Sequence, residues 1–405
     1  MWPKDPSSLL HKGEATRRAS FLELFFDLVF VFALTRVVAR AVEDLTGRAA
    51  LHQPEAVFAG AAKTVFLLLV LWAVWQSTAW TTSRYDPYQP VVQLIVLVTL
   101  VASMVMGVAA PRAFSTNADS FVAGYLIAQL SRPLMLAIAL RGHERQRLEL
   151  RMLITHSAMA SLWILGVFFA RSGTRLIFWL PALGIEYVAY RNGWPVPGLG
   201  RSVPDSGPVA GEHLAERYQQ FFLVALGEAV LVTGLTYANG QRNPASTGAF
   251  AVTIAVSILI WRVYFYRAGQ ILAEAVRQSR RPARIGSSAA DSHLLITSGV
   301  IVTAIGFELT ITHPTGHTPV PWLAVILGGP ALYLVGRSRF EHEVFNRVSP
   351  SRLVAIGLLL ALIPALLWAP PLVALTSAGL VLAGVALADA RRARGKPPEP
   401  PAPPM

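Results

Sequence analysis

Two acidic residues interrupt the apolar stretch FLELFFDLVFVFAL, which runs from Phe21 to Leu34. Glu23 and Asp27 are four residues apart, so in a helix both side chains lie on one face. A carboxylate at the centre of a membrane helix costs about 2.5–3.5 kcal/mol, and such groups mark ion pathways and proton relays. The spacing therefore predicts a polar stripe that faces other protein groups or water. Binding of a proton, binding of a cation and simple helix packing all stay open for these two acids.

A second charged stretch, EHLAERYQQFFLVALGEAVLVTG, begins at Glu212 and contains Glu216, Arg217 and Glu228. Arg217 and Glu228 are three helical turns apart and fall on nearly the same face, too far from each other to pair within one helix. No counter-ion lies near Glu228 in the sequence, and burial favours the protonated form of such a group. We therefore expect either reversible protonation of Glu228 or a permanently neutral, hydrogen-bonded side chain.

Weaker candidate residues accompany these acids. Arg132 lies deep in its apolar run and is a candidate partner for Asp27 or Glu23. His213 and Glu216 have a spacing that can hold a metal in helix bundles, but no second pair completes a site, so we predict no metal and no cofactor. The full set of secondary candidates is Arg84, Asp86, Arg132, His213, Trp261, Tyr264 and His293.

Catalytic motifs are not found. The chain has no cysteine, which excludes disulfides and thiolate chemistry. It has no H-E-x-x-H, no G-x-S-x-G and no P-loop. We therefore predict no catalytic residues and favour a function other than enzymatic activity.

The elements that must position these residues are transmembrane helices. The 405 residues are 54% hydrophobic and only 14% charged, whereas soluble domains carry roughly 25% charged residues. A helix of about 20 apolar residues crosses a bilayer. The sequence predicts an all-α polytopic bundle of about twelve spans, with ten to twelve depending on how residues 319–389 are divided. The predicted spans are 21–40, 56–80, 90–110, 119–140, 151–170, 175–190, 214–238, 246–266, 293–311, 319–336, 353–369 and 371–389.

The charge pattern sets the expected topology. Lys and Arg concentrate in alternate loops and in both tails, which predicts that the N-terminus and the C-terminus are cytoplasmic. The net charge of +12 lies in these segments, so it does not indicate a nucleic-acid partner. No A-x-A-like site follows the first apolar run, so no signal peptide is expected to be cleaved. The expected location is the bacterial cytoplasmic (inner) membrane.

The two charged stretches also suggest an internal repeat. Corresponding features recur after roughly 190–200 residues, as in transporters built from parallel six-helix repeats. The predicted parts are a cytoplasmic N-tail (1–19), a first six-helix half (20–190), a cytoplasmic linker (191–212), a second half (213–389) and a basic, Pro-rich, disordered C-tail (390–405).

Five stretches together resemble the bacterial low temperature requirement A family, over about residues 15–340. They are ELFFDLVFVFAL, WQSTAWTTSRYD, EHLAERYQQFFLVALGEAVL, WRVYF and SHLLITSGVIVTAIGFE. The resemblance implies a polytopic inner-membrane protein that is needed for growth at low temperature and whose molecular activity is not established. The polar positions that match are Glu23, Asp27, Arg84, Asp86, His213, Glu216, Arg217, Glu228 and His293.

A more distant similarity concerns the first stretch alone. FFDLVFVFALT is similar to the Phe-Ser-Asp motif of a family of potassium or proton channels built from six-helix repeats, with Phe26 in place of the Ser. This likeness is an analogy of fold and carries no activity by itself.

The favoured hypothesis is an ion channel or a proton- or ion-coupled transporter with Glu23, Asp27, Glu216, Arg217 and Glu228 at a central polar site. Its expected partners are membrane lipids and protons, monovalent cations or a small solute. Two alternatives remain: an intramembrane enzyme acting on lipid, with His213, Glu216 and Glu228 as acid–base groups, and a structural or sensory membrane protein. The sequence does not specify the oligomeric state.

Overall fold

The structure is a computed structural model that describes residues 5–10, 19–47, 53–171, 173–202, 211–266, 271–272, 274–276, 279, 282–395 and 399–402. Parts of the predicted N-tail (1–4 and 11–18), linker (203–210) and C-tail (396–398 and 403–405) lie outside the described residues. Within the described ranges every regular element is a helix, apart from two isolated β-bridges. The predicted all-α class is confirmed.

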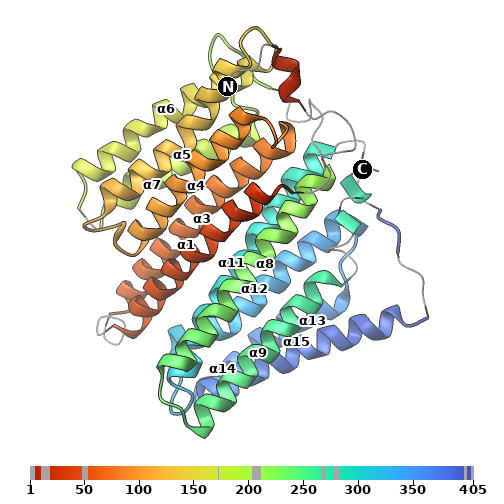
Figure 1. Cartoon of the computed structure of the whole chain (residues 1–405). Helices are drawn as coiled ribbons and strands as arrows, with labels where there is room; N and C mark the ends of the chain where they lie inside the picture. Colours follow the sequence, from red (N-terminus) through yellow and green to blue (C-terminus); the bar gives the residue numbers. More distant parts are fainter. Residues whose placement is uncertain are drawn as a thin grey trace. The chain divides into compact units, whose positions relative to one another are not determined.

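The chain divides into two compact units. The first comprises Met1–Val37, Ala62–Arg217 and Arg281–Arg284, and the second comprises Val38–Ala61, Tyr218–Arg280 and Ile285–Met405. Figure 1 shows the helices of each unit. The predicted boundaries of the two six-helix halves stay a prediction.

In the first unit, consecutive helices pack against one another: α4 (Pro90–Ala109) on α5 (Ala118–Ala139), α5 on α6 (Gln146–Phe168), and α6 on α7 (Arg175–Arg191). The unit also holds most of α1 (Phe21–Thr46) and α3 (Pro54–Arg84) and the first turns of α8 (Gly211–Asn239). Pro54 and Pro90 each open a helix, where the missing N–H has no intrahelical partner to lose.

Aromatic rings fill the centre of this unit. Trp163 and Trp179 stack with centroids 5.7 Å apart, and the ring of Phe66 lies 5.8 Å from Trp163 and 6.0 Å from Trp179. A Cβ placed on Gly166 would lie 2.3 Å from Nε1 of Trp179. Glycine at this position therefore lets the indole lie directly against the backbone of α6, as small residues do at membrane helix contacts.

The second unit contains α9 (Pro244–Phe265), α11 (Pro282–Thr312), α12 (Val320–Phe345), α13 (Pro350–Ala361), α14 (Ile363–Leu366), α15 (Pro371–Ala393) and the remainder of α8. Helix α15 packs on α9, α12 and α13. Two glycines allow helices α11 and α12 to approach closely. A Cβ on Gly299 would lie 2.3 Å from the backbone of Tyr333, and a Cβ on Gly329 would lie 2.6 Å from the backbone of Thr303.

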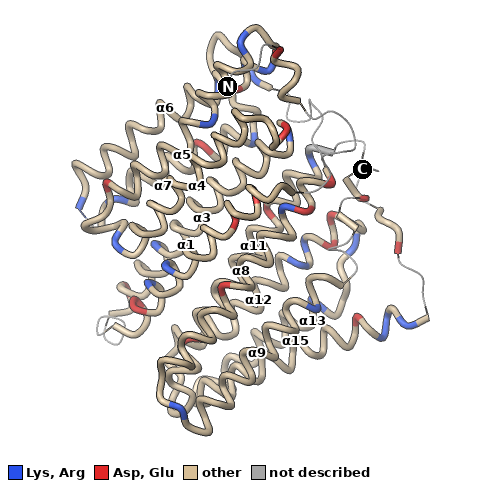
Figure 2. Tube along the Cα trace, viewed as in Figure 1, with Lys and Arg blue, Asp and Glu red and all other residues tan. Residues whose placement is uncertain are grey.

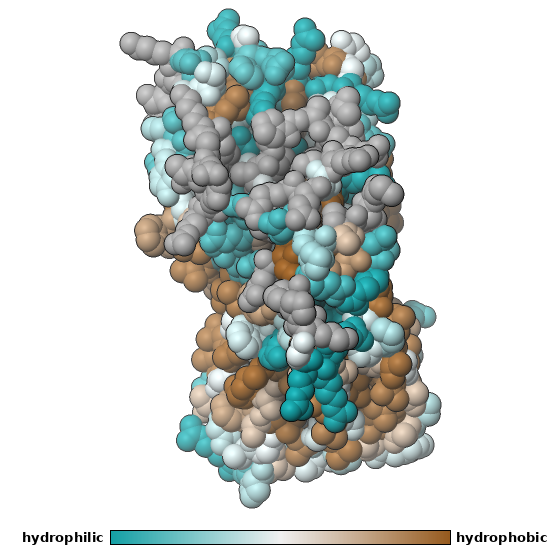
Figure 3. Space-filling view, turned by 90° about the vertical axis from the view of Figure 1, so that its right-hand side faces the viewer, coloured by the Kyte–Doolittle hydropathy of each residue, from teal (hydrophilic) through white to brown (hydrophobic). Residues whose placement is uncertain are grey.

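Nine helices of the described part are long and apolar enough to span a membrane: α3, α4, α5, α6, α8, α9, α11, α12 and α15. Many large apolar side chains on the surfaces of these helices are exposed, as Figure 3 shows for one face. Figure 2 shows charges mostly near helix ends, with a few along the helices. The chain is thus a polytopic helical membrane protein. Helix α1, with 26 residues, is also long enough to span but carries more charged residues, and α7 has 17 residues.

The predicted span 353–369 is wrong as a single helix. Helix α13 has 12 residues and ends at Ala361, and the four-residue α14 follows around Pro364. Proline removes a backbone donor and clashes with the preceding turn. At 1.5 Å per residue α13 is about 18 Å long, which is short of the roughly 30 Å hydrocarbon core.

Candidate functional site

A buried ion pair joins the first predicted charged stretch to the second. Arg217 of α8 donates from Nη1 to Oδ2 of Asp27 on α1 and from Nη2 to Oδ1, each at 2.8 Å. The indole N–H of Trp75 on α3 donates to the same Oδ1 at 2.8 Å. All three residues belong to the first unit and are almost completely buried. Two parallel N–H···O bonds to one carboxylate are the strongest geometry that arginine offers.

Glu23 lies one turn before Asp27 on α1 and caps the start of that helix. Its Oε2 accepts the backbone N–H of Ser20 at 2.8 Å and the Ser20 hydroxyl at 2.9 Å, while the Glu23 N–H donates to the same hydroxyl at 3.3 Å. This reciprocal pattern is a capping box, which satisfies free donors at a helix start. Nε2 of His213 lies 3.2 Å from Oε2 of Glu23, and Nε of Arg217 lies 3.5 Å from Oε1.

The imidazole of His213 lies between two hydrogen-bonding partners. Its Nδ1 is 3.0 Å from the Ser83 hydroxyl, which donates its proton to the Ala79 carbonyl at 2.7 Å. His213 therefore bridges the Ser83 hydroxyl on α3 and the Glu23 carboxylate on α1.

The order Ser83–His213–Glu23 has the connectivity of a hydrolytic triad, but its surroundings do not suit one. Ser83 is completely buried, and its hydroxyl donates to a carbonyl of the preceding helical turn. A nucleophile must be reached by its substrate. The contacts therefore describe a buried polar network.

We call Glu23, Asp27, His213 and Arg217 the α1–α8 cluster. Its acids are four residues apart on α1, and its bases are four apart on α8. The Glu23–His213 and Asp27–Arg217 contacts each join residues separated by 190 positions. Breaking a buried pair by removing one partner costs about 3–5 kcal/mol. The cluster thus holds the start of α8 against α1.

Glu228 lies elsewhere. It belongs to the second unit, is completely buried on α8, and neither of its carboxyl oxygens has a hydrogen-bond partner among the described residues. The charged group that acts on it is Glu308 of α11, which is half-buried and of the same sign. The favoured hypothesis gathered Glu228 with the first-helix acids, whereas the contacts pair the first-helix acids with His213 and Arg217.

Three other residues that the sequence singled out lie at helix ends and turns of the first unit. Glu216 accepts the Ala19 N–H at 3.0 Å, just before α1 begins. Arg84 lies over the ring of Trp80 at 5.0 Å. Asp86 accepts the Tyr88 N–H at 2.9 Å in the turn after α3. These contacts hold helix ends and turns and do not extend the cluster.

Arg132 does not pair with Asp27 or Glu23. It is completely buried on α5, where Nη2 donates to Gln129 at 3.1 Å, and its Nε and Nη1 have no partner among the described residues. Gln129 donates to the Tyr125 hydroxyl at 3.4 Å, and Tyr125 donates to Glu186. Tyr125, Gln129 and Arg132 share one face of α5 at spacings of four and three residues, but sequence reasoning missed the network because nothing in that spacing identifies Glu186 of α7 as the partner.

The same network extends toward α6. His156 Nδ1 lies 3.6 Å from Glu186, and the Trp163 indole donates to Glu186 at 3.4 Å. Tyr85, directly after α3, donates to Glu149 at 2.9 Å. Burial raises the pKa of Tyr85 well above its usual value, and the nearby Glu149 charge adds to the effect. Tyr85 therefore acts as a permanent donor.

The remaining candidates lie in the second unit. The Tyr264 hydroxyl is 2.8 Å from Nε2 of His293, whose Nδ1 donates to the Ala289 carbonyl at 2.7 Å. Tyr264 is therefore the donor in the first bond. Trp261 is 46% exposed and lines a shallow groove with Leu223 and neighbouring residues of α9. No three His, Asp or Glu side chains of the described residues gather in a way that could hold a metal ion.

Fold and site together define a multi-pass helical membrane protein with charged residues buried inside it. The family model of the bacterial low temperature requirement A protein (LtrA) matches residues 18–387, and the chain belongs to this family. An uncharacterized protein of Rhizobium meliloti (strain 1021), RA0937, is 30% identical over 348 residues, which cover 85% of this chain and 82% of that protein. No solved structure matches the chain.

Proposed function

We propose that this protein moves protons, alone or together with a solute, across the bacterial cytoplasmic membrane, and that Glu228 takes up and releases the proton. The observation that carries the proposal is the environment of Glu228: complete burial, with no hydrogen bond to either carboxyl oxygen among the described residues. Ionisable groups inside membrane helices are rare and mark proton relays and substrate pathways.

The energetics of this carboxyl support proton binding. An ionised carboxylate without a partner is far more costly to bury than a neutral carboxyl, so such a group normally stays protonated. Glu308 disfavours a second negative charge on Glu228. Two carboxyls that influence each other lose their protons in coupled steps. Because Glu308 is half-buried and close to the end of α11 at Thr312, it is the more accessible member of the pair.

The α1–α8 cluster supports a different role for the other acids. Asp27 accepts from Arg217 and Trp75, and Glu23 faces His213 and Arg217. Protonation of Asp27 would leave the Arg217 charge without its carboxylate partner. The cluster therefore suits a fixed latch between α1 and α8. The acid–base set of the enzyme alternative is divided, since His213 and Glu216 belong to the first unit and Glu228 to the second.

The test is proton flux in liposomes. Purified protein is reconstituted with a pH-sensitive dye inside, and a proton gradient is imposed while valinomycin and K⁺ clamp the membrane potential. We expect the wild-type protein to dissipate the gradient and Glu228→Gln to slow this flux at least tenfold. Glu308→Gln should slow it less. Separate runs with Na⁺ or K⁺ gradients distinguish proton movement from movement of a monovalent cation.

Glu55→Gln is the matched control, because Glu55 is an exposed glutamate in the first turn of α3. It makes the same chemical change outside the buried pair and should leave flux unchanged. Equal flux in wild-type and Glu228→Gln vesicles with matched protein content would refute the assignment of Glu228. Flux of no ion in any wild-type vesicle would refute transport as the function.

A further inference from the structure

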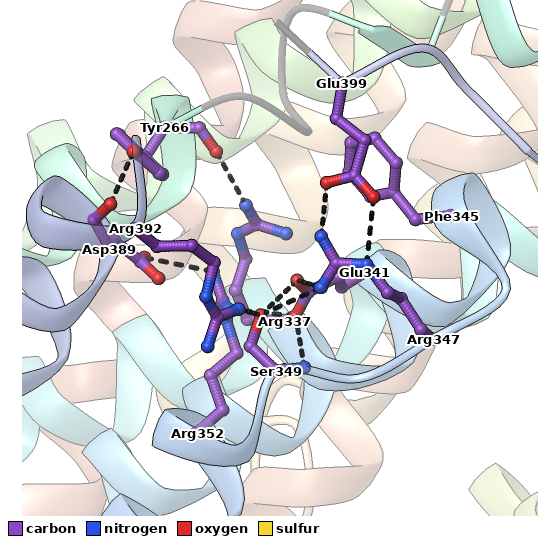
Figure 4. A pocket seen from close by; sticks show the side chains of 10 residues that line it. All are labelled: Tyr266, Arg337, Glu341, Phe345, Arg347, Ser349, Arg352, Asp389, Arg392 and Glu399. Carbon is purple, nitrogen blue, oxygen red and sulfur yellow. Dashed lines mark hydrogen bonds and ion pairs between the residues drawn. The ribbon is translucent and has the colours of Figure 1, made fainter. Parts of the chain in front are cut away.

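A pocket rich in arginine lies in the second unit, where α12, α13 and α15 meet the residue that follows α9, Tyr266. Arg337, Arg347, Arg352 and Arg392 line it together with Glu341, Asp389 and Glu399. Figure 4 shows these side chains around one cavity. Glu399 comes from the C-terminal segment, and the nearby Ala402 N–H donates to the Val344 carbonyl at 2.9 Å.

One arginine contacts two of the three acids. Arg352 donates to Glu341 at 2.8 Å and to Asp389 at 3.1 Å, and Nη1 of Arg347 lies 3.5 Å from Glu341. Arg352, Glu341 and Asp389 are each at most 5% exposed. Four arginines and three acids line the pocket, so its lining carries one more positive than negative charge.

Arg337 is the buried cation of this group. It is completely buried, and its Nε and Nη2 donate to the Val263 and Tyr266 carbonyls, each at 3.2 Å. Its Nη1 has no hydrogen-bond partner among the described residues, and Arg337 is one of the residues that line the pocket. Buried polar groups are normally paired, and one without a protein partner calls for an explanation such as a water molecule or an ion.

Glu399 occupies the mouth of the pocket. Its two carboxylate oxygens accept from Nε of Arg347, at 3.0 Å, and from Nη2 of the same guanidinium. This carboxylate raises the pKa of Arg347, mainly through the hydrogen bond. With Glu399 in place, the free volume is about 20 Å³, which suits a single water molecule. A larger anion fits only if Glu399 moves out.

We propose that this pocket is a binding site for a phosphate group, either that of an anionic lipid headgroup or free phosphate, and that Glu399 is a built-in competitor that occupies it from the C-terminal segment. A guanidinium binds a phosphate through the same pair of N–H donors that Arg347 offers to Glu399. Arg392, which donates to the Ser349 hydroxyl at the pocket wall, supplies a further guanidinium.

Exposure makes displacement of Glu399 feasible. The side chains of Arg347 and Glu399 are 39% and 34% exposed, and ion pairs at this exposure contribute little to stability. Phosphate carries more charge than a carboxylate and can reach the deeper donor on Arg337. The expected binding is therefore competitive with the C-terminal segment and sensitive to salt.

The test compares full-length wild type, Glu399→Gln and Arg347→Gln. Thermal unfolding is followed in detergent with increasing inorganic phosphate and, in parallel, chloride at matched ionic strength. A second arm uses the protein in phosphatidylcholine nanodiscs without detergent and measures binding by sedimentation. Short-chain phosphatidylglycerol is the ligand, and short-chain phosphatidylcholine is its control. Glu399→Gln should bind the phosphate group at least fivefold more tightly than wild type, and Arg347→Gln should bind at least tenfold more weakly than Glu399→Gln.

Arg391→Gln is the matched control, since Arg391 is an exposed neighbour of Arg392 that does not line the pocket. It should bind like the wild type. A response to inorganic phosphate in Glu399→Gln assigns the site to free phosphate, and a response to phosphatidylglycerol alone assigns it to the lipid headgroup; either supports the proposal. Identical responses of wild type, Glu399→Gln and Arg347→Gln to both probes would overturn it. Neither result depends on whether Glu228 carries protons.

Discussion

Removal of one partner from the Asp27–Arg217 pair offers a quantitative test of the α1–α8 cluster. Asp27→Asn keeps the side-chain shape but places an amide against the guanidinium, which keeps its charge. Loss of one partner of a buried pair costs about 3–5 kcal/mol. Because Glu23 still lies 3.5 Å from Nε of Arg217, we expect the lower end, about 3 kcal/mol. Arg217→Gln leaves Asp27 with Trp75 as a partner, and we expect about 4–5 kcal/mol.

The double variant Asp27→Asn/Arg217→Gln should be more stable than the sum of the single effects implies. It removes both charges at once, and the contact between Glu23 and His213 remains. The remaining loss is that of hydrogen bonds, about 1–2 kcal/mol. The coupling free energy between the two positions should therefore be about 5–7 kcal/mol, above the 0.5–3 kcal/mol that is usual for residues in contact.

The measurement is reversible unfolding in mixed micelles, with the free energy of unfolding extrapolated to zero denaturant. Glu55→Gln is the control, because Glu55 is exposed in the first turn of α3. A surface substitution of this kind should change stability by less than about 0.5 kcal/mol. Additive effects of Asp27→Asn and Arg217→Gln would refute the reasoning, because they would show that the two charges do not depend on each other.

Three smaller predictions follow from single contacts and use the same unfolding measurement. Trp75→Phe removes the third hydrogen bond to Asp27 and should cost about 1–3 kcal/mol, whereas an effect below 0.5 kcal/mol would contradict a role for that bond. Ser20→Ala removes the capping box of α1 and should cost about 0.5–2 kcal/mol; stability equal to wild type would argue against the cap. Gly329→Ala places a Cβ 2.6 Å from the Thr303 backbone and should cost about 1–3 kcal/mol. Gly328→Ala is its control and should be neutral, because a Cβ there meets nothing within 4 Å. Equal effects of the two substitutions would contradict the close approach of α11 and α12.

Hydropathy and spacing predicted most of the helices, because a membrane helix satisfies its own backbone and depends on local sequence. The exception is residues 353–369, where Pro364 ends the helix within a run that is apolar throughout. Local composition reports whether a residue prefers lipid, and it does not report how a proline divides the run.

The sequence singled out the acids of the first helix and also His213 and Arg217, but it did not predict that these residues pair. His213 and Arg217 repeat on α8 the four-residue spacing of Glu23 and Asp27 on α1. That complementarity could have predicted the pairing. The S-x-x-E pattern at Ser20 could likewise have predicted the capping box. In contrast, Arg132, Glu186 and the arginine pocket depend on which helices become neighbours, and no short-range pattern encodes that choice.

Two ways of keeping a carboxyl inside a membrane protein occur in this chain, and they imply a division of roles. In the α1–α8 cluster each acid has a cation within 3.5 Å, so any change of charge exposes another uncompensated charge and is opposed by several kcal/mol. Glu228 has no such cation among the described residues that act on it, so an ionised Glu228 would carry a charge that no described neighbour balances. The first arrangement suits fixed packing. The second leaves Glu228 able to gain or lose a proton without breaking an ion pair, which is the property that the proposed function requires.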